Sequence, residues 1–211
     1  MKTEDLIRAL AADTQDTRPM MSRLLMGLVP AMLVSLAALW VVLGFRADLA
    51  EALRMPDSVA RFVLTGALGL LGARLALVLA RPEGRDAARL WPLLAVVAAA
   101  VALLGWAYVT TPAEGLQMAV VGKTRTTCLV TIPLLSVLPV SAIMWALRQG
   151  ATTVPALAGF VAGLGGSGLA AAIYALHCTE DTPLFYVPWY GLAILGVTLV
   201  STVVGARLLR W

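Results

Sequence analysis

The amino-acid sequence predicts an all-α polytopic membrane protein, a six-transmembrane-helix bundle preceded by a short cytoplasmic N-terminal amphipathic helix. Two features of the composition support this prediction. Sixty per cent of the 211 residues are hydrophobic and only 13% are charged. Soluble domains have roughly 45–50% apolar residues and about 25% charged residues. Disordered chains are poor in apolar residues and rich in charge, so the composition argues against both soluble and disordered proteins.

Six apolar runs provide the third observation. Each approaches or exceeds the ~20 residues that a helix needs to cross ~30 Å of hydrocarbon, and none alternates in polarity as a membrane β-strand would. We expect the spans at about Leu24–Phe45, Val59–Ala80, Leu90–Thr110, Thr127–Leu147, Val154–Leu176 and Leu184–Ala206. The chain then divides into an N-terminal segment, residues 1–23, and a six-helix transmembrane domain, residues 24–211.

The basic residues predict the orientation in the membrane. Ten Lys and Arg residues lie on the face that holds both termini and five on the opposite face. Since basic residues favour the cytoplasmic side, both termini are expected in the cytoplasm. The net charge of +4 and the pI near 9.5 reflect this bias, so direct binding to nucleic acid is not expected.

The predicted spans lack the groups that intramembrane chemistry requires. No Asp or Glu falls inside any of them, although proton-coupled transporters and intramembrane hydrolases need ionisable groups at depth. Arg74 is the one charge deep inside a span, and its side chain is expected to snorkel to the head groups. We therefore expect no enzyme. A membrane thiol oxidoreductase and a small transporter are the alternatives, but the oxidoreductase would need a CxxC pair that the chain lacks.

Other residues within the spans predict packing. Gly159 and Gly163 form a GxxxG motif, a small-residue face that lets helix backbones approach closely within one chain or between copies in a homo-oligomer. Pro133 and Pro139 are expected to kink the fourth span. Further glycines extend the small-residue faces: Gly165, Gly166 and Gly168 in span five, and Gly66, Gly69 and Gly72 in span two. Aromatic residues expected in interfacial belts are Trp91, Trp106, Tyr108, Tyr186, Trp189 and Tyr190.

The N-terminal segment has the pattern of a short binding helix. Thr3 is a suitable N-cap, and Leu6, Ile7 and Leu10 form an apolar stripe. Residues 4–16 hold four acidic residues and a single Arg, whereas a helix that lies on lipid usually has a basic polar face. This balance favours a protein partner with an apolar groove and a basic rim. The alternative is a disordered leader, or a cap on the protein's own loops.

The two cysteines and the one histidine are predicted on the outer face. Cys128 begins span four, where the helix N-terminus and the nearby Lys123 and Arg125 are expected to lower the pKa of its thiol. Cys178 and His177 end span five. Three interpretations remain open: a structural disulfide, two inert thiols, or a sensor in which oxidation or a thiophilic metal joins the thiols. Thiolates with an imidazole suit zinc, cadmium or copper(I).

These features together resemble the NrsF family of membrane anti-sigma factors. The resemblance rests on the opening MKTEDLIRALAAD, the six spans, the two cysteines and Trp189-Tyr190 at the head of span six. It implies that the cytoplasmic N-terminal segment holds an extracytoplasmic-function (ECF) sigma factor of RNA polymerase at the bacterial inner membrane, and so regulates transcription in a stress response. The matching positions nominate five sigma contacts: Asp5, Leu6, Ile7, Leu10 and Asp13.

The resemblance also implies a role for the outward residues. Cys128 and Cys178, with His177, would sense metal or oxidative stress and trigger release of the sigma factor. No permanent cofactor is expected, only a thiophilic metal bound transiently by these three residues.

Overall fold

The computed structural model describes residues 3–5 and 19–210 and is all-helical over them. Within these residues, six helices are long and apolar enough to cross a membrane. They are α2 (Met20–Val42), α4 (Pro56–Leu79), α6 (Trp91–Thr110), α8 (Arg125–Leu147), α9 (Pro155–Tyr174) and α10 (Pro183–Leu208). The predicted six-helix membrane fold is therefore confirmed, with span boundaries that differ by at most four residues from the predicted ones.

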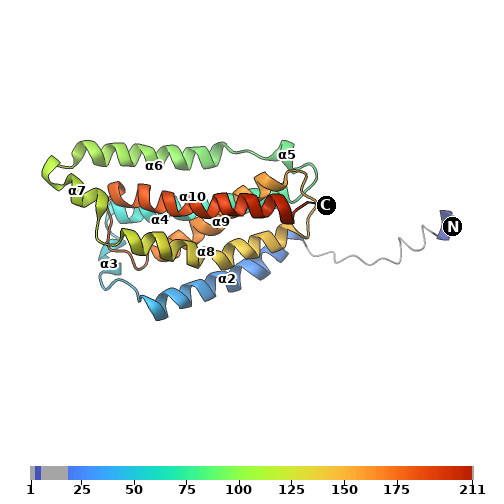
Figure 1. Cartoon of the computed structure of the whole chain (residues 1–211), viewed down its shortest axis with the longest axis horizontal. Helices are drawn as coiled ribbons and strands as arrows, with labels where there is room; N and C mark the ends of the chain where they lie inside the picture. Colours follow the sequence, from blue (N-terminus) through green and yellow to red (C-terminus); the bar gives the residue numbers. More distant parts are fainter. Residues whose placement is uncertain (1–2, 6–18, 211) are drawn as a thin grey trace.

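Three short helices lie in the connections: α3 (Leu49–Ala52), α5 (Gly84–Ala87) and α7 (Ala113–Val121). Because the number of spans is even, the start of α2 and the end of α10 lie at the same end of the bundle (Figure 1). We call this the tail end. The other end, which holds both cysteines, we call the thiol end.

Proline and threonine determine where several helices begin. Pro56, Pro155 and Pro183 occupy the first turns of α4, α9 and α10, where a missing N–H costs nothing and the fixed φ suits a helix. Thr182 caps α10, because its hydroxyl accepts a hydrogen bond from the Leu184 N–H at 3.3 Å.

The helix α9 is the centre of the bundle. It packs against α4, α8 and α10, whereas α2 and α6 lie on opposite outer sides (Figure 1). A Cβ on Gly159 would lie 2.6 Å from the Ser201 carbonyl of α10, and one on Gly168 would lie 2.7 Å from the Gly69 nitrogen of α4. The glycine face of α9 therefore packs inside a single chain. The predicted stripe on α4 was wrong at Gly66, which faces open space among the described residues.

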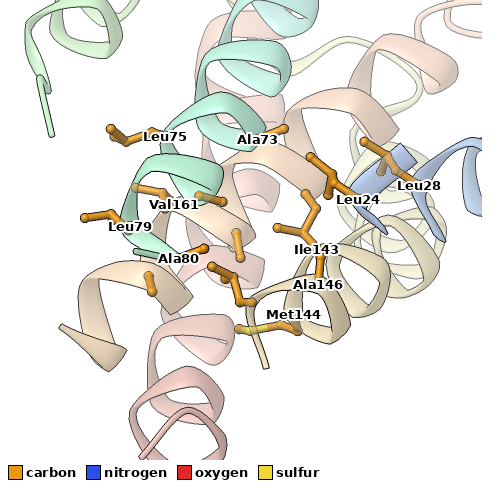
Figure 2. Packing of buried hydrophobic residues seen from close by; sticks show 14 of the residues in the cluster. Leu24, Leu28, Ala73, Leu75, Leu79, Ala80, Ile143, Met144, Ala146 and Val161 are labelled. Carbon is orange, nitrogen blue, oxygen red and sulfur yellow. The ribbon is translucent and has the colours of Figure 1, made fainter. Parts of the chain in front are cut away.

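Two apolar clusters fill the bundle, one towards each end. At the tail end, residues of α2, α4, α8 and α9 form the first cluster. Figure 2 shows Leu24 and Leu28 of α2 beside Ile143 and Ala146 of α8. The second cluster, at the thiol end, includes both cysteines. The start of α2, where the N-terminal segment leaves the bundle, is thus packed on the end of α8.

Two charged residues that the sequence does not single out are buried inside the fold. Arg74 is exposed on the surface of α4, whereas Arg61 is fully buried and Arg46 is 7% exposed. Arg61 is buried because it lies in the first turns of α4, at the thiol end, where a carboxylate from another interhelical connection pairs with it. Trp106 and Tyr108, two residues of the predicted aromatic belt, are exposed.

Candidate functional site

The two cysteines meet at the thiol end. Cys128 lies in the first turn of α8, and Cys178 lies in the turn that joins α9 to α10. Both side chains are buried and both thiols are free. The Thr124 hydroxyl lies 4.0 Å from the Cys128 sulfur and 3.8 Å from the Cys178 sulfur. The structure therefore brings together the two thiols that the sequence places at the ends of consecutive helices.

Three tyrosines surround the thiol pair. The Cys128 thiol donates a hydrogen bond of 3.3 Å to the Tyr174 hydroxyl oxygen. The ring of Tyr174 packs on that of Tyr190, with centroids 5.6 Å apart, and Tyr186 lies edge-on to Tyr190 at 6.5 Å. Tyr186 and Tyr190 are each 2% exposed, so the prediction that they belong to an interfacial belt was wrong. They form the wall of the thiol site instead.

The thiol with the lowered pKa is Cys178. Its pKa falls to about 6, chiefly because of a side-chain hydrogen bond with Cys128, while burial acts in the opposite direction. A free cysteine has a pKa near ~8.5, and the thiolate is the reactive form. The hydrogen bond with Cys128 thus favours the thiolate form of Cys178. The sequence assigned this property to Cys128 because of Lys123 and Arg125, but both cations are exposed.

His177 is turned away from the sulfurs towards a different partner. Its Nδ1 lies 3.0 Å from the Gly44 carbonyl oxygen, just after α2, to which it can donate a hydrogen bond. Its ring also packs on Tyr174, with centroids 5.9 Å apart. Over the described part of the chain, no three His, Cys, Asp or Glu side chains are grouped as a metal site. The predicted ligand set of Cys128, Cys178 and His177 is therefore not assembled in this conformation.

Two buried arginines hold the turn that carries Cys178. Arg46, after α2, binds two carboxylates: its Nε donates to Asp48 at 2.8 Å, and its Nη1 donates to Asp181 at 2.8 Å. Its Nη1 also donates to the Cys178 carbonyl at 3.1 Å. These carboxylates raise the pKa of Arg46, Asp48 first, and Arg46 lowers the pKa of Asp48 to about 2. Arg46 thus fixes the backbone of Cys178 itself.

Arg61 of α4 completes this network from the other side of the turn. Its Nη2 lies 3.0 Å from Asp181, and its Nη1 donates to the Glu180 carbonyl at 2.8 Å. Its Nη2 also lies 3.3 Å from the Ala175 carbonyl. We call Arg46, Arg61, Asp48 and Asp181 the arginine clamp. The clamp makes the position of Cys178 depend on the α2–α4 connection and on α4.

A second contact fixes the other side of the site. The Glu180 carboxylate accepts a hydrogen bond of 2.8 Å from the Lys123 N–H, just before α8. Gly122 next to it has φ +56 and lies against the Phe185 ring, so that a Cβ would overlap this ring. The segment that leads into Cys128 is thus bound to the turn that carries Cys178, which explains why the thiols approach one another.

Helix α8 joins this site to the tail end. It begins beside the thiol pair, and its last turn contacts Met20, the first residue of α2. Halfway along, the Ser35 hydroxyl of α2 donates to the Leu135 carbonyl of α8 at 3.1 Å. A shift of α8 at Cys128 would therefore act directly on the root of the N-terminal segment.

Of the five nominated sigma contacts, the structure describes only Asp5. It is exposed and lies in the helical turn Thr3–Asp5. Leu6, Ile7, Leu10 and Asp13 lie outside the described residues.

Several site residues escaped the sequence prediction. The arginine clamp joins the two arginines to Asp181, more than a hundred positions later in the sequence. No local sequence pattern therefore predicts it. For Tyr174 a weak signal exists, because a tyrosine one turn before Cys178 on an otherwise apolar helix has few polar partners to choose from. Thr124, which lies near both sulfurs, has no distinct signal in the sequence.

Comparisons with known proteins agree with the resemblance seen in the sequence. Residues 10–211 match the family described as NrsF, negative regulator of sigma F. The chain is 39% identical to the anti-sigma-F factor NrsF of Caulobacter vibrioides, and 35% identical to the probable anti-sigma-F factor NrsF of Azospira oryzae, in each case over the full length of both chains. No solved structure matches. The chain therefore belongs to the NrsF family, the negative regulators of sigma F.

Proposed function

We propose that this protein holds an ECF sigma factor at the bacterial inner membrane through its N-terminal segment, and releases it when the thiol pair is oxidised or binds a thiophilic metal. The function is regulatory rather than catalytic. The observation that carries the proposal is the contact of two free, buried thiols at the end of a helix whose other end packs on the root of the N-terminal segment.

The charge distribution supports an orientation with the tail end in the cytoplasm. Seven arginines lie at the tail end, in the terminal turns of the spans or beyond them: Arg23, Arg81, Arg85, Arg89, Arg148, Arg207 and Arg210. Over residues 19–210, the carboxylates at this end are Glu83 and Asp86 alone. The thiol end has six carboxylates, and two of its five cations are paired in the arginine clamp. Basic residues concentrate on the cytoplasmic side of membrane proteins.

The composition of the N-terminal segment suits a sigma factor as partner. Sigma factors bind DNA, and proteins that bind DNA carry Lys and Arg that neutralise phosphates. The acidic residues Asp5 and Asp13 would face such a basic surface, while Leu6, Ile7 and Leu10 would enter an apolar groove in the helix-in-groove mode. Occupation of this surface would keep the sigma factor from the polymerase.

The chemistry of the thiol pair suits oxidation by a peroxide. The Cys178 thiolate would attack one peroxide oxygen and become a sulfenic acid, while the other oxygen leaves as hydroxide and takes up the proton that the thiol had released, giving water. The Cys128 thiol would then condense with the sulfenic acid, so that a disulfide forms and a second water leaves. Two thiols and one hydrogen peroxide thus give one disulfide and two waters. Cys128 would lose its hydrogen bond to Tyr174, which changes the packing of α8 on α9.

A soft metal ion is the second candidate for the signal. It would displace the thiol protons and bind both sulfurs. His177 could join as a third ligand through its Nε2, while its Nδ1 keeps donating to the Gly44 carbonyl, as the second ring nitrogen of a metal-bound histidine usually does. A movement of the ring towards the sulfurs would therefore act on the end of α2 as well as on α8.

The required change in affinity is small. An allosteric coupling of about 1–3 kcal/mol, or 5- to 150-fold in affinity, is common. Either signal would move α8 relative to α2. This movement would change the affinity for the sigma factor through the packing of Met20 and Leu24 on the end of α8.

The test uses the full chain in lipid nanodiscs with its sigma factor. The chain should retain the sigma factor, and replacement of Leu6, Ile7 and Leu10 by Ser should lower the affinity at least tenfold, whereas Leu25→Ser on the exposed surface of α2 should not. Peroxide should release the sigma factor from the wild type but not from Cys128→Ser/Cys178→Ser. If the Leu6, Ile7 and Leu10 variant retains the sigma factor as well as Leu25→Ser does, the apolar stripe is not the binding face. If peroxide releases the sigma factor from the double cysteine variant, the thiols are not the sensor.

A further inference from the structure

A long groove between α8 and α10 has no part in the function proposed above. It encloses about 750 Å³, and its walls include Pro133, Val140 and Met144 of α8 and Val197 and Val204 of α10. Two of the three serines in the walls already bond to backbone carbonyls of the protein. The Ser136 hydroxyl donates to the Ile132 carbonyl at 2.6 Å, and the Ser201 hydroxyl donates to the Gly159 carbonyl at 2.9 Å. The groove is therefore suited to hydrocarbon.

The length of the groove matches the bilayer. Its lining residues on α8 run from Leu129 to Arg148, and nineteen residues at ~1.5 Å each span about 28 Å. The hydrocarbon core of a membrane is about 30 Å thick. The groove thus faces lipid through both leaflets, and its half near Arg148 belongs to the leaflet at the tail end.

The mouth at the tail end is positively charged. Arg148 lines it together with Leu208 and is exposed. No hydrogen bond or ion pair connects its guanidinium to another residue that the structure describes. Arg207 and Arg210 follow on the last turn of α10 and beyond, both exposed. Glu180 and Asp181, at the opposite end, are the only acidic side chains after residue 114 in the sequence, so that no side chain of α8 or α10 offers this mouth a counter-charge.

We propose that this groove binds an anionic phospholipid of the leaflet at the tail end. The phosphodiester pairs with Arg148, and an acyl chain runs along Met144, Val204 and Leu208. Basic pockets between membrane helices are known to select anionic head groups. A bound lipid would contact both the helix that carries Cys128 and the last helix of the bundle.

The same charges disfavour a second copy of the chain as the occupant. A dimer with a two-fold axis along the membrane normal would bring two identical mouths to the same depth. Arg148 and its neighbours would then face the same cations of the partner, and like charges at an interface repel. A phospholipid supplies the missing negative charge instead.

The test is native mass spectrometry of the full chain in mild detergent with added dioleoyl phosphatidylglycerol or dioleoyl phosphatidylcholine. The wild type should retain phosphatidylglycerol about fivefold better than phosphatidylcholine, and Arg148→Gln should abolish this preference. The matched control Arg54→Gln, at an exposed arginine of the thiol end, should leave the preference unchanged. Both arginines are exposed, so neither change should prevent folding.

A third variant tests the apolar part of the groove. A Cβ on Gly196 meets no described atom within 4 Å, so Gly196→Leu should fold and should reduce retention of both lipids equally. The proposal is overturned if the wild type does not prefer phosphatidylglycerol, if Arg54→Gln lowers the preference as much as Arg148→Gln, or if a dimer persists that excludes both lipids.

Discussion

The Ser35 hydroxyl of α2 donates a hydrogen bond of 3.1 Å to the Leu135 carbonyl of α8. This carbonyl is available because the residue four positions further on is Pro139, which has no N–H to close the helical hydrogen bond. In a membrane a freed backbone group must find another partner, and here a neighbouring helix supplies it. The proline of α8 therefore creates a specific link to the helix that carries the N-terminal segment.

Ser35→Ala should weaken the association of α2 with α8. The Leu135 carbonyl would lose its partner, and hydrogen bonds between membrane helices contribute about 1 kcal/mol. A loss of this size in the free energy of unfolding, measured by detergent-induced unfolding, is expected. The matched control is Ser136→Ala, since the Ser136 hydroxyl bonds within its own helix. An equal loss in both variants would contradict a role for the link between helices.

Gly72→Ala should disrupt the contact between α4 and α9. The added Cβ would lie 2.6 Å from the Gly165 nitrogen and 2.7 Å from its Cα, and these backbone atoms cannot move aside as a side chain could. Overpacking of this kind costs about 1–3 kcal/mol. Gly66→Ala on the same helix meets no described atom within 4 Å and should not lower the unfolding midpoint. If both variants unfold alike, the close approach of the helices is not what the glycines provide.

The sequence predicts the membrane helices well because each span is a local property: about twenty apolar residues leave a helix as the only structure that satisfies its backbone. The partners of buried polar groups are not local. Arg61 differs from Arg54 by seven positions in the sequence, yet one is fully buried and the other exposed. The difference depends on Asp181, whose position is known only once α9 and α10 are packed.

The thiol site shows the same limit. The topology of consecutive helices predicts that Cys128 and Cys178 lie at one end, and the structure agrees. Which thiol has the lowered pKa, however, depends on the side-chain hydrogen bond between them and not on the helix N-terminus or the nearby cations. The direction of the His177 ring depends on Gly44, at the end of a helix far away in sequence.

Arg61→Met should destabilise the protein by about 1–3 kcal/mol, because the Glu180 and Ala175 carbonyls lose their donor while Asp181 keeps Arg46. The turn that carries Cys178 should also open, so that Cys178 reacts faster with a small maleimide. Arg54→Met, at an exposed position of the same end, should change neither quantity. An equal loss in both variants would mean that the contacts of Arg61 are not the cause.

The pH dependence of alkylation should reveal the lowered pKa of Cys178. In the wild type, the rate of its reaction with an uncharged maleimide, followed by mass spectrometry, should reach half its maximum near pH 6. Cys128→Ala removes the hydrogen bond and should move this midpoint upwards, towards ~8.5. Cys128→Ser keeps a donor and should move it less. A midpoint that is the same in all three chains would contradict the claim that the hydrogen bond with Cys128 lowers the pKa of Cys178.

The lowered pKa of Cys178 also makes the free energy of unfolding depend on pH. Because the pKa of Cys178 is lower in the folded than in the unfolded chain, its ionisation stabilises the fold fully above about pH 8.5, and this contribution is lost as the pH falls through 6. The difference in unfolding free energy between wild type and Cys128→Ala should therefore shrink as the pH falls over this window.

The sidedness of the bundle tests the central claim most directly. In a Cys128→Ser/Cys178→Ser background, single cysteines would replace Glu114 at the exposed surface of the thiol end and Gln149 at that of the tail end. Intact cells would then be treated with a membrane-impermeant maleimide. The account predicts that Glu114→Cys is labelled in intact cells and Gln149→Cys only after permeabilisation. The opposite pattern would place the N-terminal segment outside the cell, where no sigma factor could reach it.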